Sequence, residues 1–80
     1  MFGRHKRNKL IREEIRLRKE RIDSLRSSKT FLIRKLDSAR ALSEDVRFEQ
    51  IRLIETSLNN IDTEMKYLTF EVSELEEKLH

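Results

Sequence analysis

The sequence predicts an all-α protein, folded as an antiparallel two-helix hairpin of the coiled-coil type with a turn near residues 41–47. Proline is absent and glycine occurs once among the 80 residues, so almost every position tolerates a helix. Apolar residues recur at spacings of three and four along both halves, which is the pattern of a helix packed against another helix. The two halves also carry opposite net charge. A long continuous helix in a coiled-coil oligomer is the alternative that fits the same pattern.

The first forty residues combine a basic tail with a helix whose apolar pattern is loose. We assign residues 1–8 to a basic, flexible N-terminal arm and residues 9–80 to one helical domain. Arg18 and Lys29 interrupt the apolar series, but such side chains can lay their methylene groups along an apolar surface and carry the charge to water. Ser27-Ser28-Lys29-Thr30 is a second candidate break, either a kink or simply a polar patch, because Ser and Thr compete with the backbone for hydrogen bonds. The apolar positions in phase are Ile11, Ile15, Ile22, Leu25, Leu32, Leu36 and Ala39.

A turn is expected in the middle of the chain because the two apolar series do not join. Leu36 and Ile51 are fifteen residues apart, one more than two heptads, so a single seam cannot run through. Ser43 is a candidate N-cap, with Glu44 and Asp45 favourably placed at the positive end of the following helix. No glycine or asparagine supplies the left-handed residue that often ends a helix, which keeps the continuous-helix alternative open.

The second helix carries the strongest pattern in the sequence. Its apolar residues fill nine consecutive seam positions at alternating spacings of three and four, over four heptads. Such a period keeps one stripe facing a partner helix, so these residues are the predicted oligomer or partner seam. They are Ile51, Ile54, Leu58, Ile61, Met65, Leu68, Val72, Leu75 and Leu79.

The charge distribution favours an antiparallel pair of helices. Residues 1–40 hold 14 Lys and Arg against 5 Asp and Glu, whereas residues 41–80 hold 4 against 10. A turn near residue 44 would place the acidic end of the second helix beside Lys9, Arg12 and Arg16. The opposite charges would then offset the unfavourable interaction of each end with the dipole of its own helix. Exposed ion pairs contribute about 0 to 1 kcal/mol each, so charge selects the orientation. The same complementarity would fit an antiparallel dimer of long helices.

Self-association is expected because a chain of this length barely buries a core of its own. Two helices of about 35 residues would leave part of each apolar stripe uncovered. We therefore predict a homo-oligomer, a dimer or higher, in which two hairpins form a helical bundle. A possible second apolar face, off the seam, consists of Phe31, Ile33, Leu53, Tyr67 and Phe70.

No residue pattern predicts an enzyme, a metal site or a cofactor. Cysteine is absent, and the two histidines lie at opposite ends of the chain. Glu77-x-x-His80 has the spacing of a metal-binding pair in helical bundles, but the seam positions Leu75 and Leu79 turn both side chains outward. No apolar run is long enough to span a membrane and no signal peptide is recognisable, so the expected location is the cytoplasm.

We therefore expect a non-enzymatic interaction protein, an oligomerisation or adaptor module that docks a protein partner of unknown identity. The alternative is a small nucleic-acid-binding regulatory protein, with a weakly sequence-specific phosphate site in the basic segment. Interleaved acids and the lack of stacking aromatics argue against that reading. Contact of Met1-Phe2 with an anionic membrane is a more remote alternative. The candidate nucleic-acid-binding residues are Arg4, Lys6, Arg7, Lys9, Arg12 and Arg16.

Overall fold

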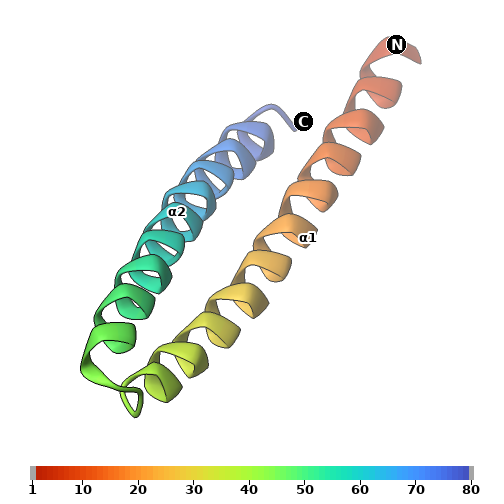
Figure 1. Cartoon of the computed structure of the whole chain (residues 1–80). Helices are drawn as coiled ribbons and strands as arrows, with labels where there is room; N and C mark the ends of the chain where they lie inside the picture. The colour runs from red at the N-terminus through yellow and green to blue at the C-terminus, as the bar shows by residue number, and fades with distance from the viewer. Residues whose placement is uncertain (1, 80) are drawn as a thin grey trace.

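The computed structural model describes residues 2–79, which form two long helices joined by a short connection. Helix α1 spans Phe2–Ala39 and helix α2 spans Glu44–Glu77. They lie side by side in opposite directions, so that the hairpin is an elongated rod with a cross-section of about 15 × 11 Å (Figure 1). The prediction of an antiparallel helical hairpin is confirmed, and the continuous-helix alternative is wrong for this structure.

Helix α1 is helical throughout its 38 residues. The candidate break at residues 27–30 does not interrupt α1: the helix continues through it, and the Thr30 hydroxyl donates a hydrogen bond to the Arg26 carbonyl at 3.1 Å. The helix begins at Phe2, so residues 2–8 of the predicted flexible arm are helical and continuous with the rest of α1. Figure 1 shows this N-terminal part of α1 extending beyond the C-terminal end of α2.

Residues 40–43 reverse the chain without any left-handed residue. The backbone N–H groups of Ala41 and Leu42 donate to the carbonyls three residues earlier, at 3.2 and 3.1 Å, so the last turn of α1 tightens. No residue from 2 to 79 has a positive φ, which explains why this turn needs no glycine. Helix α2 begins at Glu44, so residues 44–47, expected in the turn, are helical.

Ser43 is the N-cap residue of α2, as predicted, but its side chain does not make the expected hydrogen bond. Its backbone is extended, with φ −60° and ψ 152°, and its carbonyl accepts a hydrogen bond from the Arg47 N–H at 2.8 Å. The hydroxyl makes no capping hydrogen bond, so that part of the prediction is wrong. Glu44 and Asp45 occupy the first turn of α2, where their negative charges interact favourably with the positive end of the helix dipole.

The core is a single seam between the two helices. The nine predicted seam residues of α2 are all buried or half-buried, and α1 covers them. The central cluster consists of Ile11, Ile15, Ile22, Val72 and Leu75, with Met65, Leu68 and Leu79 packed against it. None of the large side chains described is fully enclosed, because two helices cannot surround a residue on all sides.

Four ion pairs across the seam set the register of the hairpin. They join Arg18 to Glu71 at 3.4 Å, Lys19 to Glu76 at 3.7 Å, Arg21 to Glu64 at 3.1 Å and Lys29 to Asp62 at 2.7 Å. The numbers of facing residues therefore add up to about 90, close to the register expected for a turn near residue 44. Within residues 2–79, no ion pair joins Lys9, Arg12 or Arg16, the residues expected beside the acidic end of the second helix, to α2.

Candidate interaction surface

The seam residues of α2 have their partner within the same chain. The most deeply buried of them, Ile54, Val72 and Leu75, are at most 9% exposed. A second chain could reach this stripe only if the hairpin opened. Large apolar side chains outside the seam therefore provide the surface that remains for another molecule. They are Leu10, Leu17, Phe31, Ile33, Leu42, Val46, Phe48, Leu53, Tyr67 and Phe70.

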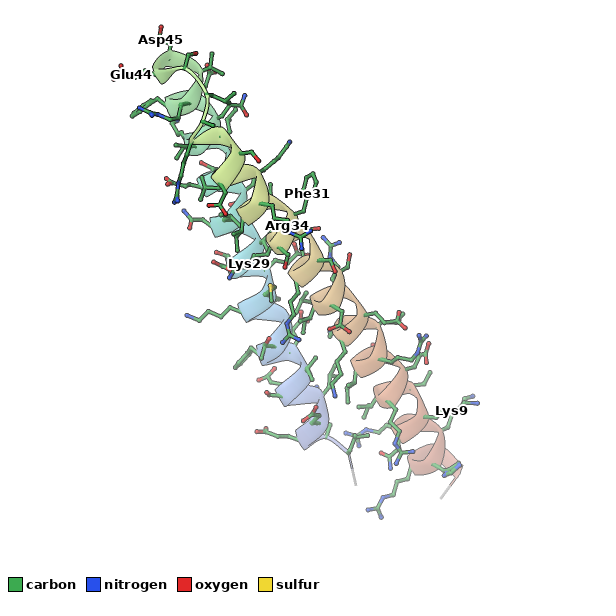
Figure 2. All side chains as sticks on the ribbon, turned by 90° about the horizontal axis from the view of Figure 1, so that it is seen from below. Lys9, Lys29, Phe31, Arg34, Glu44 and Asp45 are labelled. Atoms are coloured by element: carbon green, nitrogen blue, oxygen red, sulfur yellow. The ribbon has the colours of Figure 1, made fainter. Side chains whose placement is uncertain are left out.

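Three of the exposed residues form a row along α1. Leu10 and Leu17 are seven residues apart, and Phe31 follows two heptads later. Side chains seven apart keep a constant position relative to the seam of a coiled coil, so they lie in one row, with Ser24 between Leu17 and Phe31. Figure 2 shows Phe31 on the outer side of α1, with Lys29 directed toward α2.

A matching row runs along α2. Val46 and Leu53 are seven apart, and Tyr67 again follows two heptads later. Each row lies two positions after a seam residue, in the same rotational sense around its own helix. Because the helices are antiparallel and face each other, equal offsets place both rows on the same broad side of the hairpin. We call the six residues Leu10, Leu17, Phe31, Val46, Leu53 and Tyr67 the apolar broad face.

The ion pairs show that the hairpin has two different broad sides. Arg21 is four residues after Leu17 and Glu64 is three before Tyr67, so their pair lies between the two apolar rows. Lys19 and Glu76 pair on the opposite side of the seam. On the apolar broad face, Lys35 also lies with its Nζ 5.6 Å from the centre of the Phe31 ring.

The predicted second apolar face is only partly a single surface. Phe31 and Ile33 are two residues apart on one helix, so they point to opposite sides, and Ile33 lies away from Leu53 and Tyr67. Phe70 is three residues after Tyr67 and widens the apolar surface toward the outer edge of α2, beside Thr63 and Lys66. All five predicted residues are exposed. Their docking role stays a prediction.

Sequence reasoning missed Leu10, Leu17 and Val46. The signal that could have found them is the seven-residue spacing to Phe31 on α1 and to Leu53 on α2. It also missed Phe48, which is 75% exposed and lies on the side opposite the apolar broad face.

The predicted basic residues do not gather on one face. Arg4, Lys6, Arg7, Lys9 and Arg12 are all exposed on α1, and Figure 2 shows Lys9 pointing away from the hairpin near its open end. Neighbours two residues apart, such as Arg4 and Lys6, point in opposite directions on a helix. These charges therefore surround the first turns of α1, and their binding role stays a prediction.

Arg16 is engaged within its own helix. Its guanidinium donates to both carboxylate oxygens of Glu13 and, at 2.5 Å, to Glu20. The hydrogen bond with Glu13 raises the pKa of Arg16, and the same bond lowers the pKa of the Glu13 carboxyl. Two carboxylates thus offset its charge, so Arg16 is poorly placed to bind phosphate.

Two negative findings concern the described part of the chain only. Between residues 2 and 79, acidic and histidine side chains do not cluster in threes as a metal ion would require. Neither α1 nor α2 contains a stretch long and apolar enough to cross a membrane.

Comparisons of this chain with protein-family models, with curated proteins and with solved structures found no match. A functional proposal therefore depends on the geometry of the hairpin and the chemistry of its exposed side chains.

Proposed function

We propose that this chain is a non-enzymatic helical interaction module, an oligomerisation or adaptor protein that docks a protein partner through its apolar broad face. One observation carries the proposal. The seam is occupied inside the hairpin, yet six large apolar side chains remain exposed in two rows with heptad spacing. Such rows match the spacing of side chains on a partner helix.

The size of the exposed surface supports docking. Six large side chains that are half to two-thirds exposed present about 600 Å² of surface in total, spread along two rows that also contain Ser24, Ser38 and Asn60. Covering that area would remove it from water, at about 25 cal/mol per Å² before the costs of association. Burying these side chains against a partner adds a larger share of the total stability to a two-helix rod with a thin core than to a large globular domain.

The chemistry of the face indicates what kind of partner fits. Two parallel apolar rows with charged groups between and beside them suit an amphipathic helix or a pair of helices. Arg21 and Glu64, paired between the rows, and Lys35, beside Phe31, supply polar contacts in the middle of the face. A partner with apolar heptads and mixed charge would satisfy both features.

Site-specific photo-crosslinking in the native cell tests the proposal. A photoreactive amino acid in place of Leu53 should form covalent adducts with protein, because Leu53 is exposed on the apolar broad face. The matched control places the same group at Asn59, an exposed position on the other side of α2. Equal labelling from Asn59, or no adduct from Leu53, would contradict docking at this face.

Nucleic-acid binding is a second candidate, favoured by one observation. The bases Arg4, Lys6, Arg7 and Lys9 lie where α1 extends beyond α2, and no acid occurs before Glu13. Replacing all four by Gln should abolish duplex binding that weakens steeply with added salt, because each neutralised phosphate releases counterions. Charge-matched replacement of Arg34, Lys35, Arg47 and Arg52 is the control, and equal loss in both variants would exclude a local site.

A further inference from the structure

We propose that the occupant of the apolar broad face is a second copy of this chain, related by a two-fold axis parallel to the rod. Helix α1 of one copy then lies against α2 of the other, and both connections lie at the same end of a four-helix bundle. This inference depends on the proposed docking function and names its partner. Three features of the face carry it: the alternation of large and small residues, the distribution of charge, and the exposed area.

The large residues of the two rows alternate along the rod. Because facing residues add up to about 90, Tyr67 lies at the height of about residue 23 of α1, and Leu53 at the height of about residue 37. The α1 row carries Ser24 and Ser38 at almost those heights. A two-fold axis parallel to the rod preserves heights, so Tyr67 and Leu53 of one copy meet these small side chains of the other.

The converse holds for the aromatic residue of the α1 row. Phe31 lies at the height of about residue 59 of α2, next to Asn60, which occupies the vacant place in the α2 row. Phe31, Leu53 and Tyr67 of one copy therefore enter gaps in the rows of the other, as knobs into holes, whereas Leu17 lies at the height of Glu74. An isologous interface requires this kind of self-complementarity, since each surface must fit its own copy.

Charge selects between the two possible two-fold arrangements. On this side of the hairpin and within the length of α2, α1 contributes Arg21 and Lys35 with one acid, Glu14. An axis parallel to the rod sets this helix against the acidic α2 of the other copy. An axis perpendicular to the rod would instead set α1 against α1 and α2 against α2, with like charges opposed. The acids that α2 contributes on this side are Glu74 and the two acids already paired within their own chain, Glu64 with Arg21 and Glu71 with Arg18.

The area of the face is sufficient for a specific dimer. Two apolar broad faces of about 600 Å² each would together bury about 1,200 Å², the lower bound for a stable protein interface. The charged pair between the rows, Arg21 and Glu64, adds to that value. The estimate predicts a dimer that dissociates on dilution.

Two measurements on the full chain test the arrangement. Sedimentation across a dilution series should show a dimer of the 9.7 kDa chain. Because the chain has no cysteine, Ala41→Cys places a single spin label at the connection of each copy. The parallel arrangement predicts a short distance between the two labels. A distance near the length of α1, about 55 Å, would overturn it.

Matched variants assign the contact to the face. Tyr67 is 66% exposed, so Tyr67→Glu should leave the hairpin helical while raising the dissociation constant of the dimer at least tenfold. Phe48→Glu places the same charge on a more exposed aromatic position of the opposite side and should leave the dissociation constant unchanged. Equal weakening by both variants would overturn the assignment to this face.

The outcomes separate this inference from the proposed function. A helical chain that stays monomeric at 100 μM, while Leu53 crosslinks to a different protein, would contradict the inferred dimer but not the proposed docking function. A monomer whose Leu53 forms no crosslink would contradict both the inferred dimer and the proposed docking function. A crosslink between two copies, lost in Tyr67→Glu and kept in Phe48→Glu, supports both.

Discussion

The ammonium group of Lys29 lies 2.7 Å from the Asp62 carboxylate, although Lys29 occupies a seam position at which neighbouring heptads carry Ile or Leu. Arg18, the other charge in the α1 seam, reaches Glu71 at 3.4 Å in the same way. Both basic side chains are only half-buried, so their methylene groups cover the seam while their charges end beside acids of α2. A polar residue in a seam fixes the register of the helices at a cost in stability.

Replacing Lys29 by Leu tests this cost. The lost pair is partly exposed and contributes little, whereas Leu extends the apolar seam, so we expect the variant to be more stable by about 1 kcal/mol. Thermal unfolding followed by circular dichroism should show a rise of about 4–8 °C for a chain of this size. Asp62→Asn removes only the charge and should change the midpoint by much less. A lower midpoint for Lys29→Leu would show that the pair stabilises the hairpin.

Replacing Leu68 by Asp tests whether α1 covers the α2 seam. Leu68 is half-buried and packs against the central cluster, so an unpaired charge there should cost several kcal/mol and remove most of the helical signal. Far-ultraviolet circular dichroism measures the loss. Thr63→Asp, on the exposed side of the same helix, is the control and should stay helical. An unchanged spectrum for Leu68→Asp would mean that water already reaches this position.

The seam and the antiparallel orientation could be predicted because each depends on a regular pattern. Spacings of three and four from Ile51 to Leu79 place these residues on one face of a helix, whichever helix packs against it. All nine positions are buried or half-buried against α1. The sign of the charge in each half then orients the pair. The approximate length of the helices was also predictable, since proline is absent and the one glycine, Gly3, lies in the first turn of α1, although the helical start of α1 at Phe2 was not.

The details that sequence reasoning did not predict depend on competition between nearby groups. Hydrogen bonds between residues three apart end α1 at the connection, and no residue type in the sequence predicts this kind of helix end. Arg16 binds Glu13 and Glu20 because they lie within one turn on its own helix, whereas α2 is farther away. The separation of Phe31 from Ile33 follows only once α1 is known to be helical through both residues.

The Glu13–Arg16 pair predicts a measurable titration. The hydrogen bond from Arg16 is the largest cause of the lowered pKa of Glu13, and the charge of Lys9 is a lesser one. Arg16→Gln should therefore raise the pKa of Glu13 more than Lys9→Gln does, as followed by NMR of the side-chain carboxyl. A larger effect of Lys9→Gln would contradict the observed hydrogen bond.

The sign of the effect on stability follows from the lowered pKa. A carboxyl with a depressed pKa in the folded state stabilises the fold above its ordinary pKa, and that contribution is lost as pH falls through the folded-state pKa. Wild type should therefore lose this contribution below about pH 4, whereas Arg16→Gln has less to lose, because only the charge of Lys9 remains to lower the pKa of Glu13. Because both groups are exposed, the difference should be small and should shrink further with added salt.

Ser43 gives a prediction that separates the position of a cap from its chemistry. Replacing an N-cap serine by alanine typically costs about 1 kcal/mol because the hydroxyl accepts a hydrogen bond from a free N–H group. The Ser43 hydroxyl makes no such bond, so Ser43→Ala should cost at most a few tenths of a kcal/mol in urea unfolding. Ser38→Ala, an exposed position in the last turn of α1, is the control for the substitution itself. A loss of 1 kcal/mol or more for Ser43→Ala alone would show that the hydroxyl caps α2 in solution, with the side chain rotated toward the N–H groups of the first turn.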